Sequence, residues 1–335
     1  MSELNRRELL VQVGAAVAAT SSAGRSAFAA QAPQAPGPSR FLTGFTVSDV
    51  QTSGGPIDGA RGRIETVGTT IRVAKGGDGP PLLLLHGAPM THITWRVVGP
   101  LLAKAYTVIA PDLRGYGDSG KPPDGDEHAN YSKRVMVRDL MEVMRGFGFT
   151  RFPVVGHDRG GRVGHRMALD HPDAVTRLAV LDILPTHYLY SHVTIDFVRA
   201  YYHWFNYLRE APGPENELKA QYEAQLARAT TDAQKEFARA MNNPATIHAM
   251  CEDYRASASI DLRHDETDLK ARKKVTCPLS TLWGEKGAMG RLYDVLGVWK
   301  DWGTTVTGKG LPAGHNLQED APEIVAAELT AFLRA

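Results

Sequence analysis

Short apolar runs alternate with amphipathic helical stretches along most of this chain from residue 41 onward. Helical periodicity is clearest over residues 133–147 and 321–333, where apolar residues recur every three to four positions. The expected strands are short, β-branched runs at residues 64–73, 82–85, 107–110, 152–155, 178–181, 279–283 and 304–307. Continuous apolar runs are typical of strands buried on both faces, so the pattern predicts an α/β fold with a mostly parallel, doubly wound sheet.

The pattern changes between about residues 185 and 274. Strand-like runs disappear, and three aromatic-rich helical segments replace them: YYHWFNYL, ELKAQYEAQLARA and TIHAMCEDYRA. We therefore expect a helical cap over residues 185–274, inserted into a core that residues 41–184 and 275–335 form together.

The N-terminal residues have an export-like pattern. Arg6-Arg7 precede a weakly apolar run to Ala19 and then the small residues around Ala29. This predicts a twin-arginine signal peptide over residues 1–30, a periplasmic protein, and a Pro-rich linker over residues 31–40. A cytoplasmic protein with an N-terminal extension is the alternative. The apolar run is too short to span a bilayer, so no stable membrane insertion is expected.

Composition and charge exclude several classes of protein. With 43% hydrophobic and 22% charged residues, the 335-residue chain can bury a large core. Its net charge of +1 lacks the basic excess of nucleic-acid-binding proteins, so no nucleic-acid partner is expected. The only cysteines are Cys251 and Cys277, and the histidines lack paired-ligand spacing. We predict neither a metal nor a cofactor.

The segment Gly156-His157-Asp158-Arg159-Gly160 follows an apolar strand and opens a helix. It has the form of a nucleophile elbow, in which small flanking residues permit a strained turn that exposes the central side chain. A carboxylate there, Asp158, would displace a leaving group from sp3 carbon and form an ester that water then hydrolyses. Halides and epoxides are such substrates. An aspartate that only caps the helix is the alternative.

Other polar residues at strand ends complete a candidate site. His315 follows the last predicted strand and would activate the water. Asp182, after the strand at 178–181, would hold the imidazole, and Glu285 after the next strand competes for that role. The backbone N–H groups of Ala88 and Arg159 would form an oxyanion hole.

Arg159 and Arg162 indicate the charge of the substrate. Arg159 follows the nucleophile directly, and Arg162 lies one helical turn beyond Asp158. Two guanidinium groups at these positions can clamp a carboxylate bidentately and lower the pKa of the nucleophile. The alternative is that both arginines pair with acids on neighbouring helices.

From residue 82 to the C-terminus the chain resembles the haloacetate dehalogenases, especially the fluoroacetate dehalogenases, of the α/β-hydrolase superfamily. The most specific shared motifs are HDRGGR (157–162), LAVLDILPT (178–186), YHW (202–204), MCEDYRA (250–256) and GHNLQEDAPE (314–323). The resemblance implies an α/β-hydrolase fold with an inserted helical cap. It also implies SN2 conversion of a small haloacid and water to glycolate and halide, with the nucleophile, base, acid and carboxylate clamp on Asp158, His315, Asp182, Arg159 and Arg162.

The same resemblance implies a halide pocket in the cap. Its histidine and tryptophan match His203 and Trp204. The family's third halide donor is a tyrosine, and counting back from MCEDYRA puts Phe237 there, which cannot donate a hydrogen bond. Fluoride, the poorest leaving group, would suffer most from that loss, unless Tyr201 or Tyr207 takes the place of the missing donor. Haloacetates, fluoroacetate included, are therefore the expected substrates.

Two other functions fit parts of the pattern. An epoxide hydrolase uses the same Asp and His with two cap tyrosines, which this cap can supply, but does not need the arginine pair. A hydrolase-fold protein that binds without turnover usually lacks a catalytic residue, whereas all three are present here. Because proteins of this family often dimerise, a homodimer is also compatible with the resemblance.

Overall fold

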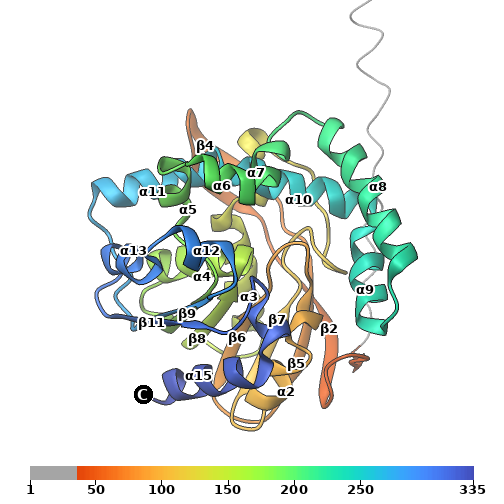
Figure 1. The fold of residues 1–335 in the computed structure, drawn as a ribbon, viewed down its shortest axis with the longest axis vertical. Coiled ribbons are helices and arrows are strands. Elements are labelled where there is room, and N and C mark those ends of the chain that lie inside the picture. The colour runs from red at the N-terminus through yellow and green to blue at the C-terminus, as the bar shows by residue number, and fades with distance from the viewer. Residues whose placement is uncertain (1–35) are drawn as a thin grey trace, which may run out of the picture. The chain divides into compact units, whose positions relative to one another are not determined.

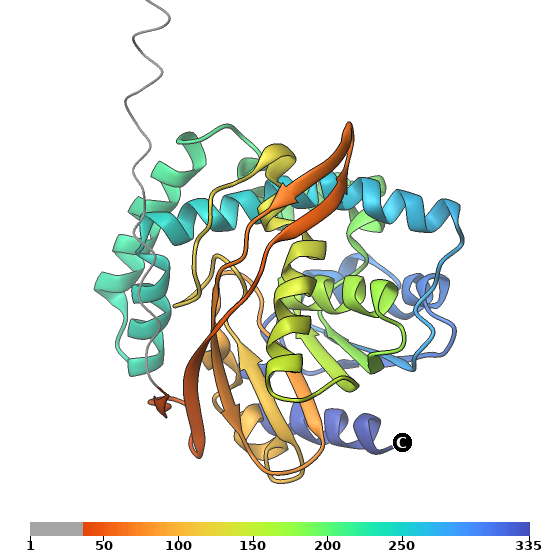
Figure 2. The ribbon, with the colours of Figure 1, turned by 180° about the vertical axis from the view of Figure 1, so that it is seen from behind.

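The computed structural model describes residues 36–335. The expected signal peptide over residues 1–30 and the first half of the expected linker lie outside the described residues. Within them, nine strands form one mixed sheet in the order β1-β2-β5-β7-β6-β8-β9-β10-β11 (Figures 1 and 2). The strands of its parallel part are β6 Pro81–Leu85, β7 Thr107–Pro111, β8 Phe152–His157, β9 Val175–Leu181, β10 Leu279–Gly284 and β11 Val306–Leu311.

The parallel strands are buried on both faces, as their apolar runs predict. In β6, Leu83 and Leu85 contribute to one hydrophobic core, and Leu82 and Leu84 contribute to a second core on the opposite face. The first core contains residues of α3 Lys133–Gly146, α4 Asp158–Asp170 and α13 Val295–Trp302. The second contains residues of α2 Val98–Leu102 and α15 Pro322–Arg334. The shorter helical elements of the core region are η1 His92–Trp95, η2 Asp126–Tyr131, α12 Ala288–Leu292 and α14 Leu317–Asp320.

The stretch between β9 and β10 lies within the described residues and contains helices but no strand. Figure 1 shows α5, α6, α7, α10 and α11 together at one end of the sheet, with α8 and α9 beside them. The bounds of these helices are α5 Thr186–Ser191, α6 Ile195–Ala200, α7 Tyr202–Asn206, α8 Gly213–Arg228, α9 Asp232–Met241, α10 Pro244–Ser257 and α11 Ile260–Lys270. We call these seven helices the cap.

The N-terminal part of the sheet differs from the sequence prediction. The single strand expected over residues 64–73 is two strands, β4 Gly62–Thr66 and β5 Thr70–Gly76. β4 pairs with β3 Gly55–Gly59 in a two-stranded hairpin. This hairpin continues the register in which β2 pairs with β5, and Thr52 N donates to Thr69 O (2.8 Å) between the two paired regions. β5 pairs antiparallel with β2 Phe45–Gln51, a strand that the prediction missed.

Two further boundaries differ. The described half of the expected linker is not free, because β1 Gly37–Pro38 pairs with β2 at the edge of the sheet. The last strand, β11, begins two residues later than the expected run at 304–307. Within residues 36–335, no helix has the length and apolar character that crossing a bilayer requires.

Candidate active site

Asp158 occupies a strained turn between β8 and α4. Its φ is +45°, in the left-handed region, and only 6% of its surface is exposed. The two flanking glycines make this turn sterically feasible: a Cβ on Gly156 would lie 2.5 Å from Gly160 O, and one on Gly160 would lie 2.4 Å from His86 O. The motif therefore forms the predicted elbow, and the strain presents the carboxylate to the space below the cap.

The Asp158 carboxylate is oriented by one hydrogen bond from the backbone. Ala88 N donates to Asp158 Oδ2 over 3.0 Å. Burial opposes ionisation of Asp158, but the neighbouring charges of His315 and the two arginines outweigh it and lower the pKa. Asp158 is thus an ionised carboxylate at neutral pH, with Oδ2 held by Ala88.

His315 is paired with the acid at the end of β9. Its Nδ1 lies 2.6 Å from Asp182 Oδ2, and Gly284 N donates to Asp182 Oδ1 over 3.0 Å. Burial lowers the pKa of His315, but the bond to Asp182 and the charge of Asp158 raise it overall. Glu285 is exposed and makes no side-chain hydrogen bond to His315. The structure therefore places Asp182, and not Glu285, beside the histidine.

His157 supports this arrangement and was not among the predicted site residues. Its Nε2 donates to His315 O over 2.9 Å, and its Nδ1 accepts from Gln318 Nε2 over 3.2 Å. Burial, together with the nearby His315, lowers the pKa of His157 to about 4, so the ring is neutral. It ties the loop that carries His315 to the elbow. A polar residue at the end of an otherwise apolar strand was the sequence feature that could have revealed it.

Arg159 differs from the expectation of a free clamp. Its Nε and Nη2 donate to the Asp253 carboxylate on α10 (2.9 and 2.6 Å), and both side chains are fully buried. Asp253 also pairs with Lys133 and accepts from the Tyr116 hydroxyl (2.7 Å). This is the ion pair that the sequence left open as the alternative. Only Nη1 of Arg159 is buried without a partner.

Arg162 makes no ion pair with any described residue. Its Nη1 donates to Leu184 O and to Thr186 Oγ1 (3.0 Å each), and its Nε is buried without a partner. Burial and the adjacent Arg159 lower the pKa of Arg162. Leaving a buried donor unsatisfied costs about 1–3 kcal/mol. A carboxylate that accepted from both arginines would remove two such costs and the mutual repulsion.

Aromatic residues of the cap face the two arginines. Arg162 lies over the Trp204 ring (4.6 Å) and Arg159 over the Tyr254 ring (4.2 Å). The Tyr254 ring lies 6.1 Å from the ring of His203 and 5.9 Å from that of Trp204. Burial and the charge of Asp158 raise the pKa of Tyr254, which keeps its hydroxyl protonated.

The placement of Phe237 was wrong. Phe237 lies on α9 and packs against the second hydrophobic core, whereas Tyr254 lies next to His203 and Trp204. Counting back from MCEDYRA led away from Tyr254, because this tyrosine is inside that motif, on α10. Phe237 lies on the preceding helix, α9. Three side chains that can donate a hydrogen bond, those of His203, Trp204 and Tyr254, therefore lie together in the cap.

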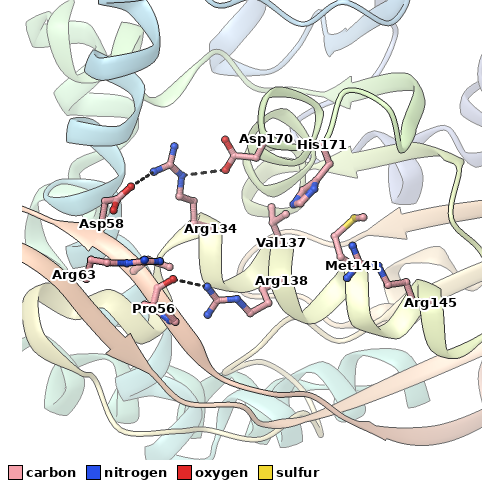
Figure 3. Close-up of a pocket in the computed structure, with 11 residues that line it drawn as sticks. Pro56, Asp58, Arg63, Arg134, Val137, Arg138, Met141, Arg145, Asp170 and His171 are labelled. Carbon is pink, nitrogen blue, oxygen red and sulfur yellow. Dashed lines mark hydrogen bonds and ion pairs between the residues drawn. The ribbon is translucent and has the colours of Figure 1, made fainter.

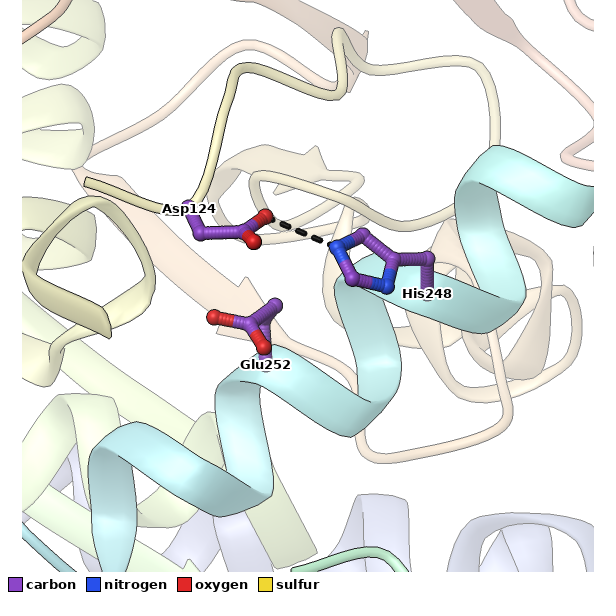
Figure 4. Close-up of side chains that lie close together, drawn as sticks. All are labelled: Asp124, His248 and Glu252. Atoms are coloured by element: carbon purple, nitrogen blue, oxygen red, sulfur yellow. Dashed lines mark hydrogen bonds and ion pairs between the residues drawn. The ribbon is translucent and has the colours of Figure 1, made fainter. Parts of the chain in front are cut away.

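One group of described residues has the spacing of metal ligands: Asp124, His248 and Glu252 (Figure 4). Both ring nitrogens of His248 already face carboxylates, Nε2 with Asp124 (2.8 Å) and Nδ1 with Glu215 (3.1 Å). These two contacts raise the pKa of His248 to about 10. These contacts make the group an ion network that links α10 to α8 and to the loop before η2.

The fold and the site define a class of protein: an α/β hydrolase with an aspartate at the nucleophile position. Residues 80–322 match the family described as alpha/beta hydrolase fold, and the chain belongs to this family. More particularly, it is 44% identical over 290 residues to a fluoroacetate dehalogenase from Burkholderia sp., covering 83% of this chain and 95% of that protein. The predicted fold and the predicted resemblance are both confirmed.

Other relatives include epoxide hydrolases. A soluble epoxide hydrolase from Corynebacterium sp. (strain C12) is 32% identical over 279 residues, with 77% of this chain and 91% of that protein covered. Among solved structures, a putative acyltransferase from Salmonella enterica matches with a TM-score of 0.81 at 43% identity, covering 89% of this chain and 98% of that one. A putative epoxide hydrolase from Pseudomonas aeruginosa matches with a TM-score of 0.78 at 38% identity, covering 89% of this chain and 98% of that one.

Proposed function

We propose that this protein hydrolyses haloacetates, fluoroacetate included, to glycolate and halide. The observation that carries the proposal is the pair of buried, unpartnered guanidinium N–H groups, Arg159 Nη1 and Arg162 Nε, beside the ionised Asp158. This arrangement suits a substrate that presents a carboxylate to the arginines and an electrophilic carbon to the aspartate. The similarity to a fluoroacetate dehalogenase supports the same substrate class.

The first step is displacement at the α-carbon. Because Asp158 Oδ2 accepts a hydrogen bond from Ala88 N, the attacking oxygen is Oδ1. A new C–O bond forms as the carbon–halogen bond breaks, and the halide leaves with the electron pair of that bond. His203, Trp204 and Tyr254 donate hydrogen bonds to the departing anion. Burial lowers the pKa of His203, so its ring is neutral and still carries one N–H donor.

The second step is hydrolysis of the ester on Asp158. Esterification removes the negative charge of Asp158, which is one of the contributions that raise the pKa of His315. The ring therefore becomes easier to deprotonate, and neutral His315 can accept a proton from the attacking water. The ester carbonyl oxygen is Oδ2, which already accepts from Ala88 N, so the same N–H stabilises the oxyanion together with the N–H of Arg159 in the first turn of α4.

The proposal is tested with four variants and three halides. Purified protein is assayed for halide release from fluoroacetate, chloroacetate and bromoacetate. Asp158→Asn should abolish release, and His315→Asn should release one halide per site and retain an ester detectable by mass spectrometry. Asp182→Asn should slow turnover, while the matched Glu285→Gln should not. Steady turnover by His315→Asn at the wild-type rate would remove His315 from the mechanism.

A second candidate, epoxide hydrolysis, has one structural observation in its favour. The hydroxyl of Tyr190 is buried without a partner, and its ring lies 5.4 Å from Trp204, so it could protonate an opening epoxide together with Tyr254. This reaction leaves the two guanidinium N–H groups unused. Turnover of styrene oxide without any halide release from the three haloacetates would favour it.

We further propose that residues 1–30 export the folded protein to the periplasm and that it works there as a homodimer. The Arg6-Arg7 pair and the small residues before residue 30 support export. Fractionation of cells that express the full chain should place it in the periplasm, and an Arg6→Lys/Arg7→Lys variant should stay in the cytoplasm. Size-exclusion chromatography with light scattering should give twice the mass of the processed chain.

A further inference from the structure

A cavity lies far from Asp158, at the other end of α4. It measures about 390 Å³ and is lined by the β3–β4 hairpin, by α3 and by the last residues of α4. Figure 3 shows the lining side chains arranged around one common space. Because α4 rises about 1.5 Å per residue, Asp158 and Asp170 are separated by roughly 18 Å. The cavity is therefore distinct from the candidate active site.

The cavity has an arginine-rich rim and an apolar floor. Arg134, Arg138 and Arg145 occur on α3 at spacings of four and seven residues, which is one face of a helix, and Arg63 projects from the hairpin. The floor is formed by Ile57, Val137 and Met141. We call these four arginines and their floor the arginine groove.

The two acids of the groove do not balance its arginines. Asp170 is shared between Arg134 (3.0 Å), Arg166 (2.9 Å) and Lys273 (3.6 Å). Asp58 is mostly exposed and lies 3.9 Å from Arg134. Both acids are therefore used by Arg134 and by cations outside the groove, and neither pairs with the other three arginines.

Three guanidinium charges remain without a counter-charge. Arg138 donates only to neutral acceptors: Gly55 O (2.7 Å), Pro56 O (2.8 Å) and Thr66 Oγ1 (2.9 Å). Arg63 and Arg145 make no hydrogen bond or ion pair with any residue in the described range 36–335. Burial, and the charge of Arg145, lower the pKa of His171 beside them, so this ring adds no further charge at neutral pH. Like charges on one helix face are destabilising, and an anion in the groove would reverse that effect.

We infer that the arginine groove binds a small phosphate-bearing anion. Guanidinium groups match phosphate oxygens through paired N–H donors, and several arginines around a concave site favour a multivalent oxyanion over chloride. The apolar floor leaves room for a short organic group attached to the phosphate. This site is independent of the dehalogenase proposal, since it shares no side chain with the Asp158 site.

The test uses the full chain and pyrophosphate as the probe, titrated calorimetrically at constant ionic strength, with orthophosphate and chloride in parallel. We expect saturable binding with one site per chain. Arg63→Gln/Arg145→Gln should weaken it at least about tenfold, and halide release from haloacetates should stay unchanged. The matched control is Arg228→Gln/Arg334→Gln, which removes two exposed arginines elsewhere and should bind as the wild type does.

Four results would overturn the inference. Equally weak binding of pyrophosphate by both double variants would mean that binding responds to net charge alone. The absence of saturable binding would contradict the inference, and so would chloride that competes as well as orthophosphate does at the same ionic strength. Tighter binding of a single-stranded oligonucleotide than of pyrophosphate, lost in the groove variant, would assign the groove to a nucleic acid instead.

Discussion

Tyr254→Phe tests the halide pocket with the smallest change available. Tyr254 is 3% exposed and packs on Arg159, His203 and Trp204, and phenylalanine keeps every ring contact. The variant removes one hydrogen bond to an anion, worth about 1.5–3 kcal/mol. If the bond acts in the transition state, halide release should slow by about 10- to 150-fold. The effect should be larger for fluoroacetate, because fluoride is the poorer leaving group and the stronger hydrogen-bond acceptor.

The assay compares kcat/KM for fluoroacetate and chloroacetate by ion-selective electrode, with thermal melting as a check of folding. Phe237→Tyr is the control, because the sequence pointed to that position and the structure does not. It should leave both rates unchanged, since Phe237 packs against the second core. A loss below about twofold in Tyr254→Phe, or a gain in fluoride release in Phe237→Tyr, would refute the assignment of Tyr254 as a halide donor.

Three more predictions concern charged groups. Asp253→Asn breaks a buried ion pair, which should cost about 3–5 kcal/mol and lower Tm by roughly 5–8 °C, and a calorimetric scan with unchanged Tm would contradict this. Arg162→Ala should raise KM for chloroacetate far more than for a neutral epoxide, in steady-state assays of both. Asp124 and Glu215 raise the pKa of His248 from 6.5 to about 10. Protonated His248 therefore stabilises the fold fully below pH 6.5, and this contribution is lost as the pH rises towards 10. The free energy of unfolding of His248→Gln, measured in urea, should lack that pH dependence.

The buried strands could be predicted from the sequence, and the edge of the sheet could not. β6, β8 and β9 are continuous apolar runs, so their pattern alone indicates a strand covered on both faces. β2 and the β3–β4 hairpin carry mixed polar residues, because one side of each is open to water. These strands pair in one register, from Phe45 with Gly76 to Gly59 with Gly62, and no local pattern encodes that register.

The site divides in the same way. The motifs placed Asp158, Asp182 and His315 at strand ends, and parallel strands bring such ends to one edge of the sheet, so their meeting follows from the fold. The ion pair of Arg159 could not be predicted in this way, because its partner Asp253 lies 94 residues away in the cap. The same holds for Tyr254, whose position beside His203 depends on how α10 packs across α7.

Helix α10 therefore links recognition of both ends of the proposed substrate. Asp253 fixes Arg159, which faces the carboxylate, and the next residue, Tyr254, faces the halide. Because Lys133 at the start of α3 holds Asp253 from the core side, this helix is anchored by buried charges. A shift of α10 would displace a carboxylate donor and a halide donor together, so the distance between the two subsites is set by one rigid element. This explains why a small substrate could be aligned with Asp158 by a cap that the chain inserts far from the nucleophile.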